Sequence, residues 1–164
     1  ESKLTSVFIV NDEKGYPEGS FKTTLGNEES YELRKEIKES SVKDYFKKIQ
    51  TRYGNDVTLE NPGIDSLTRL EDPAAVHYDF DLKNLLSGDV IYFNPMMAEM
   101  YKNNPFKSAE RHYPVEMPYQ TGETYILSME IPKGYQVDEL PKSARVALNG
   151  GDGTFEYLIQ KNAP

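Results

Sequence analysis

The chain has 164 residues, of which 27 are acidic and 19 are basic, so its formal net charge is −8. The densest basic cluster is Lys47-Lys48, which is too small to bind a nucleic-acid backbone or an anionic membrane surface. The absence of cysteine excludes disulfides, thiolate nucleophiles and cysteine-ligated zinc together. The chain starts at Glu1 without a charged-then-apolar leader, and we interpret it as a piece of a longer protein.

Two strands are predicted at the start of the chain. Residues 4–10 form a short apolar run that ends in the turn-rich cluster 11–15, and residues 20–25 follow as a second strand. The chain therefore begins with a hairpin whose strands are joined by a long loop. Its 12 tyrosines and 7 phenylalanines favour half-buried pleated surfaces of this kind.

Two helices are predicted next, over residues 28–39 and 42–53, with one kinked helix as the alternative. Asn27 stands at the N-cap position of the first helix, with two glutamates in the first turn. Ser41, followed three residues later by Asp44, resembles a capping box for the second helix. The second helix has an apolar stripe at helical spacing, made of Val42, Tyr45, Phe46, Ile49 and Tyr53.

A period of two takes over after residue 56 and predicts strands. Residues 61–63, Asn-Pro-Gly, indicate a loop. The clearest alternation places Val76, Tyr78, Phe80 and Leu82 on one face and His77, Asp79 and Asp81 on the other. Residues 89–93 are predicted to form a further strand, and residues 96–101 one or two helical turns.

The C-terminal part is predicted to be antiparallel β-structure. The run 113–117 contains proline and fits an edge strand. In the next run, Tyr125, Leu127, Met129 and Ile131 face inward, which predicts a central strand. Residues 135–137 are expected to form a short strand. Residues 144–148 and 154–159 are expected to pair as a hairpin across a glycine-rich turn.

These patterns together predict an α+β protein with a mainly antiparallel, β-sandwich-like body and an N-terminal helical segment. Alternation lapses between Pro95 and Pro105, where asparagine and proline concentrate. We therefore expect one part over residues 1–95, with the N-terminal strands, the helical hairpin and the first strands of the body. The C-terminal antiparallel part then covers residues 96–164. One continuous domain over 1–164 is the alternative.

Several short motifs carry a resemblance to a known family. They are Asn-Pro-Phe at 104–106, Arg-His-Tyr-Pro-Val at 111–115, and Ile-Pro-Lys-Gly-Tyr-Gln-Val followed by Leu-Pro-Lys within 131–142, with a final hairpin after them. This order resembles the domain of unknown function that follows the transglutaminase-like core in large secreted proteins of Bacteroidetes. The resemblance covers most of the chain and is most specific over residues 88–158.

The resemblance implies a context for this chain and no chemistry of its own. The parent protein would carry an N-terminal β domain and a transglutaminase- or protease-like core outside this sequence. The chain would then be a non-catalytic accessory domain that packs against or positions that core, in a secreted, periplasmic or cell-surface protein. The family usually continues with further strands, whereas this sequence stops at Pro164, so the final sheet is expected to be incomplete or completed by a neighbour.

Catalysis by this chain itself is not expected, and neither is a cofactor. A transglutaminase-like or papain-like site requires a cysteine beside a histidine. The sequence also contains no Gly-x-Ser-x-Gly nucleophile elbow, no phosphate-binding glycine loop with lysine and no helical zinc motif with two histidines. The remaining possibility of a stand-alone hydrolase is the weakest of the functional hypotheses.

Two pairs of polar residues are candidates for a metal or acid–base site. His77 and His112 are the only histidines, and nothing in the sequence brings them together, so solvent-facing side chains are the simpler interpretation. Asp79 and Asp81 share one strand face and have the chemistry to hold calcium or to act as acid and base. An exposed acidic face that pairs with lysine across the strands is the better interpretation.

A glycan- or peptide-binding β module is the main alternative function. The tyrosines that would form an aromatic platform are Tyr113, Tyr119, Tyr125, Tyr135 and Tyr157, and most fall at inward positions, which favours core packing. The candidate interaction surface consists of Arg111, His112, Tyr113 and Tyr119. A binding module should expose tyrosine rings in a groove, whereas a packing domain should expose an apolar patch without its covering neighbour.

Overall fold

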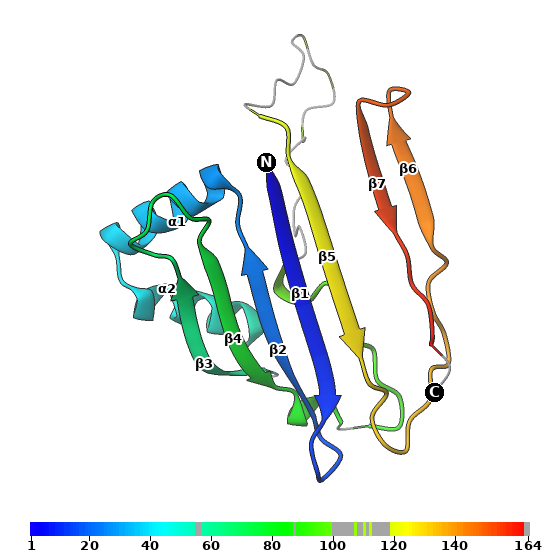
Figure 1. Cartoon of the computed structure of the whole chain (residues 1–164). Coiled ribbons are helices and arrows are strands. Elements are labelled where there is room, and N and C mark those ends of the chain that lie inside the picture. The colour runs from blue at the N-terminus through cyan, green and yellow to red at the C-terminus, as the bar shows by residue number, and fades with distance from the viewer. Residues whose placement is uncertain are drawn as a thin grey trace. The chain divides into compact units, whose positions relative to one another are not determined.

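Figure 1 shows the computed structural model of the chain, which describes residues 1–54, 57–86, 88–99, 107, 110, 112 and 119–162. The chain forms two compact units, Glu1–Glu130 and Ile131–Pro164. Two helices accompany a mostly antiparallel β body, so the predicted α+β class is confirmed. The division of the chain expected between residues 95 and 96 stays a prediction.

The first unit contains a five-stranded sheet with the order β3-β4-β2-β1-β5. Its strands are β1 (Ser2–Asn11), β2 (Pro17–Thr24), β3 (Thr58–Asp65), β4 (Ala75–Asp81) and β5 (Gly122–Met129). Strands β1 and β2 form the predicted N-terminal hairpin. The pairing of β1 with β5 is parallel, and the other pairings in the sheet are antiparallel.

Both predicted helices are confirmed, as α1 (Asn27–Glu39) and α2 (Val42–Tyr53). The N-cap of α1 is Gly26 and not the predicted Asn27; the Glu29 carboxylate accepts a hydrogen bond from the Gly26 N–H at 3.3 Å. The cap of α2 is the predicted one, because the Ser41 hydroxyl accepts from the Asp44 N–H at 3.0 Å.

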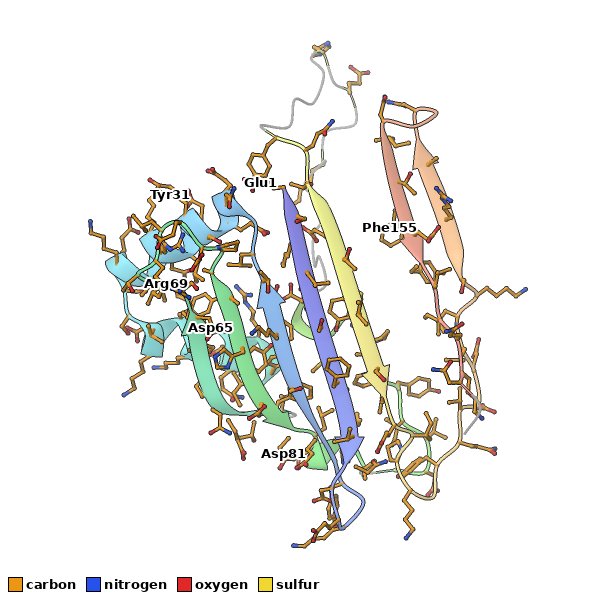
Figure 2. All side chains as sticks on the ribbon, viewed as in Figure 1. Glu1, Tyr31, Asp65, Arg69, Asp81 and Phe155 are labelled. Carbon is orange, nitrogen blue, oxygen red and sulfur yellow. The ribbon has the colours of Figure 1, made fainter. Side chains whose placement is uncertain are left out.

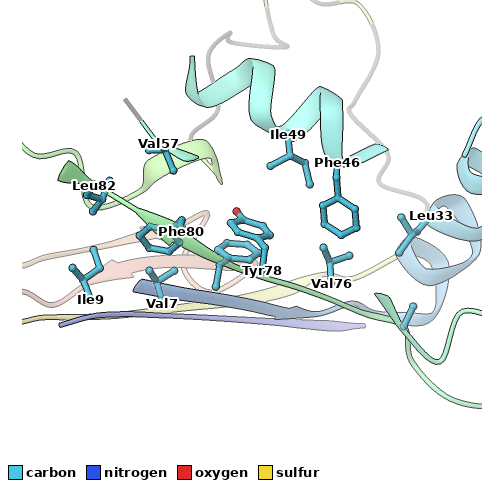
Figure 3. Close-up of a cluster of buried hydrophobic side chains, with 12 residues drawn as sticks. Val7, Ile9, Leu33, Phe46, Ile49, Val57, Val76, Tyr78, Phe80 and Leu82 are labelled. Atoms are coloured by element: carbon cyan, nitrogen blue, oxygen red, sulfur yellow. The ribbon is translucent and has the colours of Figure 1, made fainter. Parts of the chain in front are cut away.

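The hydrophobic core lies between the helices and one face of the sheet (Figure 3). Within β4 the predicted alternation is confirmed, since Val76, Tyr78 and Phe80 are all buried. The Tyr78 ring stacks on Phe21 of β2, with centroids 4.6 Å apart. The sheet and the helices contribute the buried side chains Val7, Ile9, Phe21, Leu33, Phe46, Ile49, Val76, Tyr78 and Phe80.

The loop predicted at residues 61–63 is wrong. These residues lie within β3, which continues through a register shift between Glu60 and Gly63. The bulge accommodates Asn61 at a positive φ of 48° and tolerates Pro62, because an edge strand does not need every N–H for pairing. Turn-forming residues therefore bend this strand without ending it.

The strand predicted at residues 89–93 is also wrong. This segment has no regular structure and leads into a short 3₁₀ turn, Met97–Glu99, which lies within the helical turns predicted at 96–101; residues 100 and 101 lie outside the described part. Tyr92 is almost fully exposed and Phe93 packs against the core, but the segment pairs with no strand of the described sheets. Another 3₁₀ turn, Lys83–Leu85, follows β4.

Strand β5 lies at the edge of the sheet and not at its centre as predicted. Tyr125, Leu127 and Met129 do face the core as expected, but Ile131 is partly exposed and belongs to the second unit. The predicted strand at 113–117 lies outside the described residues.

The second unit contains the predicted hairpin, formed by β6 (Ala144–Leu148) and β7 (Gly153–Tyr157). Its turn uses positive φ angles at Asn149, Gly150 and Gly151, which two glycines adopt without steric cost. Residues 135–137, predicted as a strand, have no regular structure.

Candidate functional site

The face of the sheet opposite the helices carries apolar side chains on neighbouring strands. On β1 the buried residues Thr5, Val7 and Ile9 alternate with outward-facing ones, and β5 adds one more outward apolar residue. We call the set the open-face stripe; its members, with exposed fractions, are Leu4 (46%), Phe8 (53%), Val10 (44%) and Ile126 (49%). An apolar patch on adjacent strands typically marks an interaction surface.

An open depression of about 440 Å³ lies along this face. Leu4, Ser6 and Phe8 line it from β1, and residues of β2 line its other side. The floor is low because two of the residues that line it are small, namely Ser6 on β1 and Ser20, which is the β2 partner of the larger Phe8. The shape and the mixed lining suit a side chain of a packed neighbour.

Polar pairs occupy the other half of the same face, on β2, β3 and β4. The Lys22 ammonium lies 3.2 Å from the Asp65 carboxylate, which also lies 3.5 Å from the His77 imidazole. The Asn61 amide donates to the Asp79 carboxylate at 2.9 Å. The face therefore divides into an apolar half on β1 and β5 and a charged half on the remaining strands.

Arg34 of α1 organises the loop between β3 and β4. Its guanidinium donates to the backbone carbonyls of four loop residues at 2.7–3.2 Å, namely Ser66, Leu67, Arg69 and Asp72. Figure 2 shows Arg69 on this loop beside the helix that carries Tyr31. The cation takes the place of the missing backbone partners and holds the loop in one conformation.

On the helix-covered side, the 3₁₀ turn at 97–99 is tied to the sheet. Lys3 and Glu99 form an ion pair of 2.9 Å. Burial by itself lowers the pKa of Lys3, but the hydrogen bond to Glu99 and the charges of Glu99, Glu29 and Glu123 together more than offset that effect and raise it. The Tyr125 hydroxyl donates to the Pro95 carbonyl at 2.7 Å. Residues 95–99 are thus part of the first unit's packing.

The core tyrosines are unsuited to acid–base chemistry. The Tyr53 and Tyr78 hydroxyls are 2.8 Å apart and share a hydrogen bond. Burial, followed by the neighbouring Tyr53, raises the pKa of Tyr78 well above its ordinary value, and burial likewise raises the pKa of Tyr125. These hydroxyls stay protonated at neutral pH, and the tyrosines contribute to the core through ring packing and hydrogen bonds.

The predicted interaction surface is only partly described. Arg111 and Tyr113 lie outside the described residues, whereas His112 and Tyr119 are exposed. Of the other tyrosines weighed as a platform, Tyr125 is half-buried with its hydroxyl engaged. Tyr135 and Tyr157 belong to the second unit.

Neither the histidine pair His77 and His112 nor the aspartate pair Asp79 and Asp81 forms a metal or catalytic site within the described residues. His77 contacts Asp65, and no contact joins it to His112. Asp79 takes the Asn61 amide as its partner in place of the expected lysine, and Lys22 pairs with Asp65. Among the described ranges no three histidine, aspartate or glutamate side chains come close enough to hold a metal ion. No described helix is long and apolar enough to cross a membrane.

Two features were missed by reasoning from the sequence. The open-face stripe had a signal, because residues 7–10 are apolar at both alternating positions, which indicates a strand with two apolar faces. Arg34 had none, since its partners are backbone carbonyls more than 30 positions away. A long-range side-chain-to-backbone contact leaves no pattern in the sequence.

No curated protein and no solved structure matches the chain. A family model matches residues 89–163, a segment that includes β5 and the β6–β7 hairpin but neither helix nor strands β1 to β4. The matched family is DUF3858, described as a domain of unknown function with a solved structure.

Proposed function

We propose that the chain is a non-catalytic accessory part of a secreted transglutaminase-like multidomain protein, where it packs against or positions the catalytic core. The observation that carries the proposal is the open-face stripe. Its four side chains lie on two adjacent strands and are 44–53% exposed. The motifs that resemble the domain following such a core support the same context, and they lie within the segment that matches a domain of unknown function.

The size of the stripe favours a partner in the same polypeptide. Burying the exposed parts of four such side chains stabilises a contact by about 3–5 kcal/mol. Free association costs about 4–15 kcal/mol in lost motional freedom. A tethered neighbour, present at an effective concentration of about millimolar, avoids most of that cost. The stripe therefore suits the core of the parent chain better than a freely diffusing protein.

The absence of cysteine supports the non-catalytic part of the proposal. Amide transfer of the transglutaminase type uses a thiolate, and this chain has none to offer. The purified chain should not process a peptide or a glycan. Turnover by the chain alone that disappears in His77→Ala or His112→Ala would contradict the assignment.

The docking is tested by labelling position 8. Because the chain has no cysteine, Phe8→Cys introduces one thiol on the open face. Its alkylation, followed by peptide mass spectrometry, is expected to slow at least about tenfold when the chain is part of the longer protein with its core, as burial excludes the reagent. Tyr31→Cys on α1, an exposed position outside the stripe, should react equally in both. Equal rates at position 8 would refute the proposal.

A further inference from the structure

The two edges of the five-stranded sheet differ in how they are protected against pairing. Edge strand β3 has a bulge between Glu60 and Gly63, a proline at 62, and charges at Glu60 and Asp65. These are the features by which natural sheets prevent their edges from adding another strand. The edge strand β5 has no bulge and no proline, and its one charge, Glu123, lies near its start; residues 124–129 read Thr-Tyr-Ile-Leu-Ser-Met, without charge.

The backbone of β5 shows which residues face away from β1. The Gly122 N–H donates to Glu1 and the Glu130 N–H donates to Ile9, so even-numbered residues direct their backbone groups toward β1. Backbone direction alternates along a strand, and the groups of Tyr125 and Leu127 therefore point to the outer edge. In the part of the chain that the structure describes, β5 has a strand neighbour on one side only.

We propose that β5 pairs antiparallel with β5 of a second copy of this chain, around a two-fold axis at Ile126. This inference goes beyond the proposed function, since its backbone hydrogen bonds lie at the edge of the sheet and, of the open-face stripe, only Ile126 takes part. In this register Tyr125 of one copy exchanges backbone hydrogen bonds with Leu127 of the other. The two sheets become one continuous sheet across the axis.

The side chains of β5 are complementary to themselves in this register. Ile126 meets its own copy, and Thr124 meets Ser128, both on the open face. Tyr125 meets Leu127 on the core side. The Glu123 of each copy lies opposite Met129, so no like charges face one another. The Ile126 pair occupies a non-hydrogen-bonded position, where opposing side chains approach most closely.

The expected association is weak and reversible. One strand-to-strand contact buries less than the roughly 800 Å² per partner of a standard interface. Sedimentation equilibrium of the whole chain, over a concentration series that reaches about 1 mM, should show the average mass rising from one chain to two. A single species of one chain mass throughout would overturn the proposal.

A charge exchange at the axis separates self-pairing from other contacts. Ile126→Lys and Ile126→Glu each place two like charges opposite one another and should weaken the dimer about tenfold or more. An equal mixture of the two variants should restore it. Glu60→Lys on the protected β3 edge is the control and should leave the dimer unchanged. A dimer that persists in both Ile126 variants would place the contact elsewhere and refute the inference.

Cysteine cross-linking tests the register of the two β5 strands and does not require the charged variants to fold. Ile126→Cys should give a disulfide-linked dimer on mild oxidation, because the Cα distance of such a pair fits a disulfide. Ser128→Cys should not, since its own copy lies several residues away along the strand. Cross-linking at 128 without cross-linking at 126 would contradict the proposed axis. The alkylation rate at position 8 tests the docking of the open face and does not depend on cross-linking at position 126. The proposed function and the β5 dimer can therefore fail separately.

Discussion

At the scale of single residues, Arg34 shows how one side chain replaces regular structure. Four loop carbonyls accept hydrogen bonds from its guanidinium, and the loop ends where the Ala74 N–H donates to the Ser30 hydroxyl of the same helix. The start of β4 is therefore positioned by α1. Lysine would present one ammonium in place of a planar fork and would satisfy fewer of these carbonyls.

The Arg34 contacts predict a measurable cost. Arg34→Met should lower the free energy of unfolding by about 2–3 kcal/mol, because it leaves carbonyls without partners in a partly buried loop. Urea denaturation measures the change. Lys35→Met, at the neighbouring exposed position, should stay within about 0.5 kcal/mol of the unsubstituted chain. Equal effects of the two substitutions would mean that the loop does not depend on Arg34.

At the scale of elements, β2 depends on a close approach at Gly19. A Cβ atom there would lie 2.5 Å from the Phe80 ring and 2.6 Å from the Phe8 carbonyl oxygen. The glycine lets the Phe80 ring pack across the strand on the core side. Local patterns mark Gly19 only as a residue unfavourable in strands, and the ring that requires it lies on β4.

Gly19→Ala should therefore destabilise the first unit by about 1–3 kcal/mol, since the added methyl group forces the Phe80 ring or the backbone to move. Gly122→Ala on β5 is a matched control, because its nearest atom would be 3.7 Å away. Thermal unfolding should show a lower Tm for the first variant and a small change for the second. A normal Tm for Gly19→Ala would show that the Phe80 ring moves without cost.

The helices could be predicted almost completely because their signals are local. Ser41 and Asp44 lie three residues apart and meet as expected, and Gly54 ends α2 at a positive φ of 67°. The strands were harder. Residues 61–63 have the composition of a turn, yet pairing with β4 draws them into a bulged strand. Alternation in β5 indicates which side is buried and contains no information on the number of neighbouring strands.

At the scale of the whole molecule, the matched family segment and the compact units do not coincide. The match covers residues 89–163, whereas the first unit runs to Glu130. Strand β5 lies inside the match but pairs with β1, which lies outside it. The core of that sheet is built from residues before position 89. Residues 89–163 therefore lack most of the side chains against which β5 packs.

Truncation tests this dependence. A chain of residues 1–130 should unfold cooperatively, because it retains both helices, all five strands and the buried cluster. Residues 89–164 alone should give no cooperative transition by circular dichroism, since β5 loses β1 and an isolated two-stranded hairpin is only marginally stable. Cooperative unfolding of the 89–164 piece would show that it forms a core of its own.

The sequence by itself determined the α+β class, the positions of both helices, the buried face of β4 and the absence of a thiol, because capping, periodicity and composition are local properties. Only the tertiary structure decided the parallel pairing of β1 with β5, the bulge in β3 and the position of β5 at the end of the described sheet. The candidate surface belongs to this second group in part, since the apolar run 7–10 marks the outward face of β1 but not the neighbouring strand. Leu4, Phe8 and Ile126 become one stripe only when strands more than 100 residues apart in the chain lie side by side, and long-range pairing of this kind leaves no mark in local sequence patterns.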